Sequence, residues 1–134
     1  MAVFADTFFY LALLNPLDAD HARVRAESRS RRGLVVTTHW VLMEVADAFA
    51  RPAYRSKFVA LLKQLDADPT SKLIPADEAL FRRGVELYEA RPDKDWPLTD
   101  CVSFVVMEEE QISEALTADV HFEQAGFVAL LRSA

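Results

Sequence analysis

Four acidic residues lie where an apolar segment ends or a helix is expected to begin: Asp6, Glu44, Asp100 and Asp119. A carboxylate beside apolar residues is costly unless it is paired, hydrogen-bonded or bound to a cation. One such residue could be a helix cap, but four spread along the chain indicate that folding gathers them around one ion. Carboxylate oxygens are the ligands that hard divalent cations prefer, so we predict a site for such a cation.

The softer metal ligands do not form a competing site. The chain has one cysteine, Cys101, and three histidines, His21, His39 and His121, without the spacing typical of zinc sites. His121 follows Asp119 by two residues. We interpret it as a partly exposed structural residue, with a contact to a phosphate as the alternative.

Each acid also has an alternative without a metal. Asp6, Asp100 and Asp119 lie near expected helix starts, where an acid is a common cap. Glu44 lies among apolar residues inside an expected helix, so its alternative is a buried salt bridge to an arginine.

Apolar runs alternate with amphipathic segments, which predicts alternating strands and helices. The predicted strands span 2–5, 34–37, 72–75, 113–117 and 127–130. The predicted helices span 7–14, 18–32, 38–50, 54–66, 77–90, 98–110 and 119–126. Asp77 is expected to cap the fifth of these, whose inward-facing residues would be Leu80, Phe81, Val85 and Tyr88.

This order predicts an α/β fold of right-handed βαβ units with helices on both faces of a mostly parallel sheet. Ligands bind beyond the carboxyl ends of such strands, at a switch point of the strand order. The four acids follow strands or lie in the helices after them, so we expect them to meet at that edge. No linker or repeat interrupts the 134 residues, which indicates a single domain over 1–134.

The formal net charge of −6 argues against binding nucleic acid by bulk electrostatics, although a carboxylate metal site is itself acidic before the cation arrives. Five arginines lie within residues 23–32. We interpret them as a solvated helix face. The alternative is that Arg23, Arg25 and Arg29 contact RNA phosphates.

No apolar run approaches the length of about 20 residues that spans a bilayer, so no membrane contact is expected. The first ten residues lack the basic region of a signal peptide. The single cysteine fits a reducing compartment, and we expect a cytoplasmic protein.

The chain resembles the PIN-domain ribonucleases, specifically the VapC-like toxins of type II toxin–antitoxin systems. The matching segments surround the four acids: FADTFFYLALLN, TTHWVLMEVADAF, DWPLTDCVSFVVM and ALTADVHFEQAGF. The last two are the most specific, while residues 50–75 add little. The resemblance implies a three-layer α/β/α sandwich with four or five strands, and hydrolysis of RNA phosphodiester bonds that depends on Mg²⁺ or Mn²⁺.

The resemblance also implies roles for single residues. Asp6, Asp100 and Asp119 would hold the principal metal, and Glu44 would complete the site. Two threonines, Thr7 and Thr117, would hydrogen-bond metal waters or phosphate oxygens. Asp95 would add an outer ligand and ranks below the four acids.

Partners are implied by the resemblance alone: an RNA substrate, a cognate antitoxin that blocks the groove near the acids, and a second copy of the chain in a homodimer. The alternative function is a PIN-like module that binds RNA or protein without cleaving it. Retention of all four acids disfavours this alternative.

Overall fold

The computed structural model describes residues 1–132 as twelve elements in alternating order. The strands are β1 (Val3–Ala5), β2 (Val35–Thr38), β3 (Ser71–Ile74), β4 (Glu114–Leu116) and β5 (Val128–Ala129). The helices are α1 (Thr7–Leu14), α2 (His21–Ser30), α3 (His39–Ala48), α4 (Arg55–Ala67), α5 (Glu78–Ala90), α6 (Leu98–Glu109) and α7 (Val120–Gln124).

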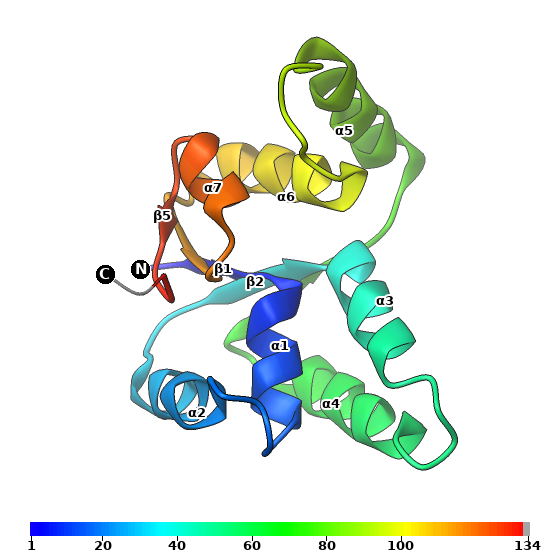
Figure 1. Ribbon diagram of the computed structural model, residues 1–134, viewed down its shortest axis with the longest axis vertical. Helices are drawn as coiled ribbons and strands as arrows, with labels where there is room; N and C mark the ends of the chain where they lie inside the picture. The colour runs from blue at the N-terminus through cyan, green and yellow to red at the C-terminus, as the bar shows by residue number, and fades with distance from the viewer. Residues whose placement is uncertain (133–134) are drawn as a thin grey trace.

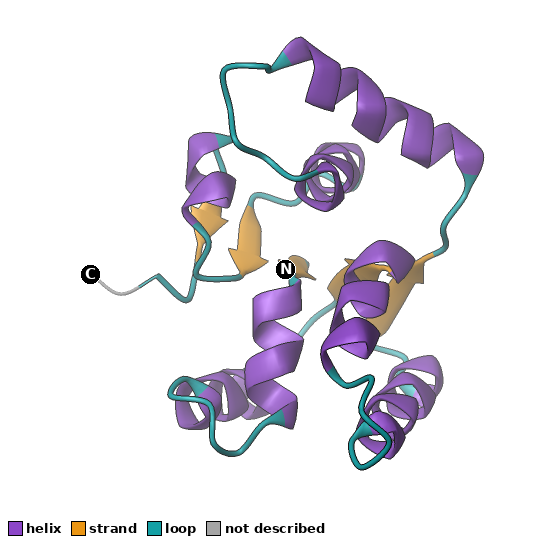
Figure 2. Ribbon diagram, turned by 45° about the vertical axis from the view of Figure 1, so that its right-hand side comes forward, coloured by secondary structure: helices purple, strands orange, loops and turns teal. Residues whose placement is uncertain are grey.

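The five strands form one parallel sheet in the order β3-β2-β1-β4-β5. Helices α1, α2 and α4 lie on one side of this sheet, and α5, α6 and α7 lie on the other (Figure 1). Helix α3 packs against α1 and α4. Figure 2 shows the same layers from a second direction. The predicted three-layer α/β/α sandwich is therefore confirmed.

Strand β1 lies at the centre of the sheet, and its residues belong to the fully buried core. Val3, Phe4 and Ala5 have no solvent exposure, as expected for a parallel strand covered on both faces. The ring of Phe4 lies 6.3 Å from that of Phe122, which meets Phe104 edge to face at 4.9 Å. These contacts join β1 to α6 and α7, so the core fixes the strand that precedes Asp6.

Helix α5 buries a different face from the predicted one. Phe81 is 37% exposed and Tyr88 is 54% exposed, so the prediction that both face inward is wrong. Leu80 and Gly84 are the buried residues of this helix. A side chain at Gly84 would collide with Val102 of α6. The missing side chain therefore lets the two helices approach closely, and that contact sets the face that α5 buries.

Several predicted boundaries hold within a few residues. Thr38 caps α3 by accepting a hydrogen bond from the backbone N–H of Val41, and Asp77 caps α5 in the same way from Leu80. Helix α2 begins at His21 rather than at Asp18, because the Asp18 carboxylate accepts a hydrogen bond from the N–H of Asp20 and forms a turn.

Within residues 1–132, every helix falls short of the length and apolar character that crossing a membrane requires.

Candidate active site

The carboxyl ends of β1 and β4 meet at the point where the strand order reverses. Ala5 of β1 pairs with Leu116 of β4, so Asp6 and Thr117 follow neighbouring strands. The Asp6 N–H donates to the carbonyl of Leu116 at 3.4 Å, and the Thr117 hydroxyl donates to Asp6 Oδ2 at 3.0 Å. Thr117 is fully buried, and the Asp6 carboxylate is therefore fixed within the sheet edge.

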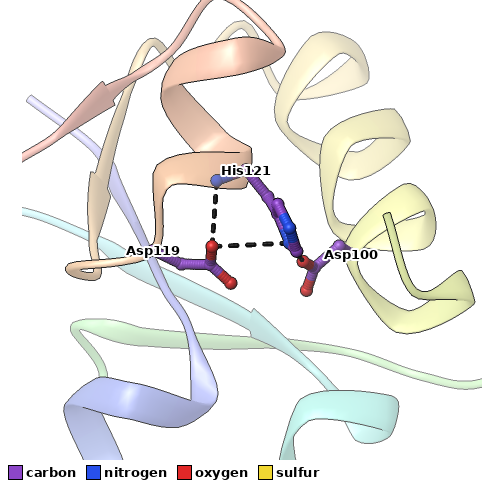
Figure 3. Close-up of side chains that lie close together, drawn as sticks. All are labelled: Asp100, Asp119 and His121. Carbon is purple, nitrogen blue, oxygen red and sulfur yellow. Dashed lines mark hydrogen bonds and ion pairs between the residues drawn. The ribbon is translucent and has the colours of Figure 1, made fainter. Parts of the chain in front are cut away.

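Helices α6 and α7 bring Asp100 and Asp119 to the same edge. Asp100 lies in the first turn of α6, and Asp119 precedes α7 as its N-cap. His121 of α7 lies between them: its Nδ1 is 3.1 Å from Asp100 Oδ2 and 3.4 Å from Asp119 Oδ1 (Figure 3). One ligand atom from each of these three residues lies within 4.8 Å of the other two.

Glu44 reaches the site from α3 and is exposed rather than buried. The Thr7 hydroxyl donates to Glu44 Oε1 at 2.6 Å, which orients the carboxylate across 37 residues of sequence. Among residues 1–132 no arginine forms an ion pair with Glu44, so the alternative of a buried salt bridge is wrong. The exposed carboxylate is instead available to a ligand.

The four carboxylates influence one another electrostatically. The pKa of Asp6 is raised to about 7, chiefly by burial and also by the charges of Asp100 and Glu44, while hydrogen bonds from Thr7 and Thr117 act in the opposite direction. Burial also raises the pKa of Asp100 to about 6, with Asp119 and Glu44 acting in the same direction and His121 opposing them. A cluster of acids with raised pKa values is typical of a functional site.

Capping explains one of the acids. Asp119 Oδ1 accepts a hydrogen bond from the His121 N–H at 2.9 Å and therefore caps α7. Asp6 precedes α1 but makes no side-chain cap bond. Asp100 lies inside α6, past the cap position, which Pro97 occupies. Capping therefore leaves the positions of Asp6 and Asp100 unexplained.

The donor set suits a hard divalent cation. Within the part of the chain that the structure describes, no lysine or arginine forms an ion pair with any of the four acids. Two of these carboxylates are nearly buried, and such groups need a compensating positive charge when they ionise. Asp6, Asp100, Asp119 and Glu44 offer the oxygen ligands that Mg²⁺ and Mn²⁺ accept.

The remaining predicted residues lie farther from this cluster. Asp95 is exposed in the loop before α6, and the hydrogen bonds and ion pairs found over residues 1–132 include none that joins it to the four acids. Arg23, Arg25 and Arg29 are exposed on α2, on the opposite side of the sheet from α6 and α7 (Figure 1). Arg23 pairs with Asp20 at 2.7 Å. The roles of these four residues stay predictions.

His121 lies against this cluster of acids, a contact that its interpretation as a partly exposed structural residue does not predict. Its imidazole contacts two predicted ligands, although the ring is about one quarter exposed, as expected. The signal available in the sequence was its position two residues after Asp119, at the start of a helix. The contact with Asp100 spans 21 residues and depends on how α6 and α7 pack.

Comparison with known proteins finds chains that are similar in sequence and in fold. The 23S rRNA-specific endonuclease VapC20 of Mycobacterium tuberculosis is 29% identical over 127 residues, which cover 94% of this chain and 95% of that protein. The crystal structure of the same VapC20, described as a Sarcin-Ricin loop cleaving toxin, matches with a TM-score of 0.85 at 26% identity. That match covers 96% of this chain and 98% of the other.

In sequence and in fold, this chain resembles the VapC-like PIN-domain proteins.

More distant structures share the fold of this VapC-like chain. FitAcB from Neisseria gonorrhoeae matches with a TM-score of 0.65 at 20% identity, covering 96% of this chain and 95% of the other. VapBC2 from Rickettsia felis, bound to a DNA fragment from its promoter, matches with a TM-score of 0.67 at 11% identity and covers 96% of each chain. No protein-family model matches the chain.

Proposed function

We propose that this protein is a ribonuclease that hydrolyses RNA phosphodiester bonds with Mg²⁺ or Mn²⁺, and that it is the toxin of a toxin–antitoxin pair. The observation that carries the proposal is the meeting of Asp6 and Asp100, both nearly buried, with Glu44 and Asp119 at one edge of the sheet. VapC20, the relative that matches over nearly the whole chain, is an rRNA-specific endonuclease. Its substrate, 23S rRNA, is the first RNA to test.

The four carboxylates would hold the cation. Asp6, Asp100 and Asp119 would be its ligands, and Glu44 would complete the site from α3. When bound, a divalent cation supplies positive charge for the phosphoryl oxygens and makes a water molecule a better nucleophile. The hydroxyls of Thr117 and Thr7 fix the orientation of Asp6 and Glu44, so the carboxylates need not reorganise when the substrate arrives.

The attacking group is water rather than a side chain. Cys101 is fully buried beside Asp100, and burial raises the pKa of its thiol, which keeps it protonated. Ser103 is also fully buried, and its hydroxyl donates to the carbonyl of Thr99. These two nucleophile candidates near Asp100 are therefore inaccessible to a phosphodiester.

We propose that a cognate antitoxin covers an apolar groove at the end of α1, a different surface from the groove near the acids that the resemblance implies. The groove has a volume of about 690 Å³, and its lining includes Leu11, Leu17, Phe49 and Tyr54. Leu17 and Tyr54, which line this groove together, are 93% and 44% exposed. An amphipathic helix or strand of a small protein partner would bury this surface.

We also propose a homodimer that acts in the cytoplasm. Phe81 and Tyr88 on the outer face of α5 supply an exposed aromatic surface that a second copy could cover. RNA substrates and the single cysteine, Cys101, are consistent with a reducing intracellular compartment. Light scattering of the purified protein would give twice the monomer mass of 15.1 kDa for the dimer. A monomer mass at micromolar concentration would contradict the dimer.

The test of the function is cleavage of 23S rRNA fragments by the purified protein. We expect cleavage with Mg²⁺ or Mn²⁺, none with EDTA, and none for Asp100→Asn. The matched control is Asp66→Asn, the same substitution at an exposed position of α4, which should cleave like the wild type. Binding of RNA without cleavage under all metal conditions would favour the alternative of an inactive binding module.

A further inference from the structure

We propose that His121 is a nitrogen ligand of the cation and makes the site prefer Mn²⁺ to Mg²⁺. The inference rests on the proposed metal-dependent function and extends it from the acids to the choice of metal. The four acids offer only oxygen ligands, so His121 would add a nitrogen ligand to the site. Its evidence is the position of the imidazole ring between two of the proposed ligands.

The backbone and side chain of His121 are both held toward the acids. Its N–H donates to Asp119 Oδ1 at 2.9 Å, which fixes the first turn of α7. The ring then points across to α6, so that Nδ1 lies 3.1 Å from Asp100 Oδ2 (Figure 3). The ring therefore already lies beside both acids before a cation binds.

The separations suit ligands of one ion. Neighbouring ligands of an octahedral cation lie about 3 Å apart when the bonds are about 2.1 Å long. The distance of 3.1 Å from Nδ1 to Asp100 and of 3.4 Å to Asp119 is close to this value. The three ligand atoms all lie within 4.8 Å of one another, so one cation could contact all three.

A nitrogen ligand changes the order of metal preference. Mg²⁺ selects oxygen ligands and gives up its waters reluctantly, so an imidazole adds little to its binding. Mn²⁺ is a first-row transition ion and binds sites of mixed nitrogen and oxygen ligands, with affinities that follow the Irving–Williams order. The set of Asp100, Asp119 and His121 would therefore strengthen Mn²⁺ binding more than Mg²⁺ binding.

The same geometry has a second interpretation that an experiment can separate. His121 Nδ1 could carry a proton and donate a hydrogen bond to Asp100, which would only orient that ligand. Such a donor would support both cations equally. An asparagine could also replace it, because the Asn amide N–H₂ can occupy the position of Nδ1. His121→Asn therefore retains the hydrogen bond and removes the imidazole.

The experiment compares Mn²⁺ and Mg²⁺ binding by calorimetry, without RNA, in the wild type, His121→Asn and a control. We expect the wild type to favour Mn²⁺, and His121→Asn to reduce the ratio of the two affinities by at least about tenfold. The control is His21→Asn on α2, where the ring Nδ1 bonds the carbonyl of Ala12 at 2.8 Å, away from the acids. It should leave the ratio unchanged.

Pulsed electron paramagnetic resonance of bound Mn²⁺ gives a direct readout of the atoms that bind the metal. We expect nitrogen modulation from one directly bound imidazole in the wild type and its loss in His121→Asn. Tight binding of both metals without this modulation would overturn the inference and leave the proposed function intact. A wild type that binds neither metal would overturn the inference and the metal dependence together.

Discussion

The four carboxylates at the sheet edge form two pairs in different surroundings. Asp6 and Asp100 are 5% and 6% exposed, whereas Glu44 is exposed and Asp119 is partly exposed. Burial raises the pKa of both members of the first pair. The second pair is positioned by ordinary hydrogen bonds, from Thr7 and from the start of α7. Burying an ionised carboxylate costs free energy unless the charge is compensated, so the buried pair indicates function more strongly than the exposed pair.

Removing a carboxylate from each pair should have unequal effects on RNA cleavage. Asp6→Asn should reduce the rate by more than about 100-fold, because it removes a proposed buried ligand of the cation. Glu44→Gln should reduce it by about tenfold, because the exposed residue only completes the site. Single-turnover cleavage measures both, with Asp66→Asn as the control. Equal losses for Asp6→Asn and Glu44→Gln would contradict the distinction between the buried and the exposed pair.

The buried pair should also govern stability without metal. The pKa of Asp6 rises from 3.8 to about 7 on folding, so between these values the folded chain retains a proton that the unfolded chain releases. The free energy of unfolding should therefore fall as pH rises from about 4 to about 7, and stay low above that. Asp6→Asn should raise it at pH 8 by about 2–4 kcal/mol and change it little at pH 4.

Denaturant unfolding in EDTA measures this effect at both pH values. Glu44→Gln is the matched comparison from the exposed pair and should change the free energy of unfolding by less than about 0.5 kcal/mol. If Asp6→Asn is no more stable than the wild type at pH 8, burial of this carboxylate does not strain the metal-free fold.

Cation binding should depend on pH through the same pair. Asp6 and Asp100, with pKa values of about 7 and about 6, must lose their protons before they can bind a cation. Saturating Mn²⁺ should raise the melting temperature by about 5–10 °C at pH 8 and much less at pH 5.5. Differential scanning fluorimetry checks this. A shift of the same size at both pH values would mean that the buried pair does not bind the ion.

The smallest expected effect concerns the arginines of α2. Arg25 and Arg29 form no ion pair within residues 1–132, but they lie across the sheet from α6 and α7. If both contact RNA phosphates, replacing them with alanine should lower the slope of log affinity against log salt by about 1.4. The slope is measured from RNA binding by proteins that all carry Asp100→Asn, with and without the arginine substitutions. Arg83→Ala on α5 is the control. An unchanged slope would favour the interpretation of α2 as a solvated face.

Much of the fold could be predicted because its signals are local. The strands are short apolar runs, and the helix starts after β2 and β3 carry the caps Thr38 and Asp77. The inward face of α5 could not be predicted in the same way. Periodicity favours Phe81 and Tyr88. The close approach of α5 to α6 depends instead on Gly84 having no side chain, and a glycine gives no apolar signal in the sequence.

The candidate site also has features that the sequence predicts and features that it does not. Asp6 and Asp119 follow strands that pair in the sheet, so their convergence follows from the parallel topology. The exposure of Glu44 could not be predicted, because it depends on how α3 packs against α1 rather than on the apolar residues beside it. The contact of His121 with Asp100 depends on the packing of α7 against α6 and is equally non-local.

The most direct test of the account is a crystal structure of the wild-type protein grown with Mn²⁺ near pH 8, with anomalous scattering recorded at the manganese edge. The account predicts an anomalous peak bounded by the carboxylates of Asp6, Asp100 and Asp119, with Glu44 facing it from α3. A well-ordered site with no anomalous peak among these residues, or a peak confined to another surface, would contradict it.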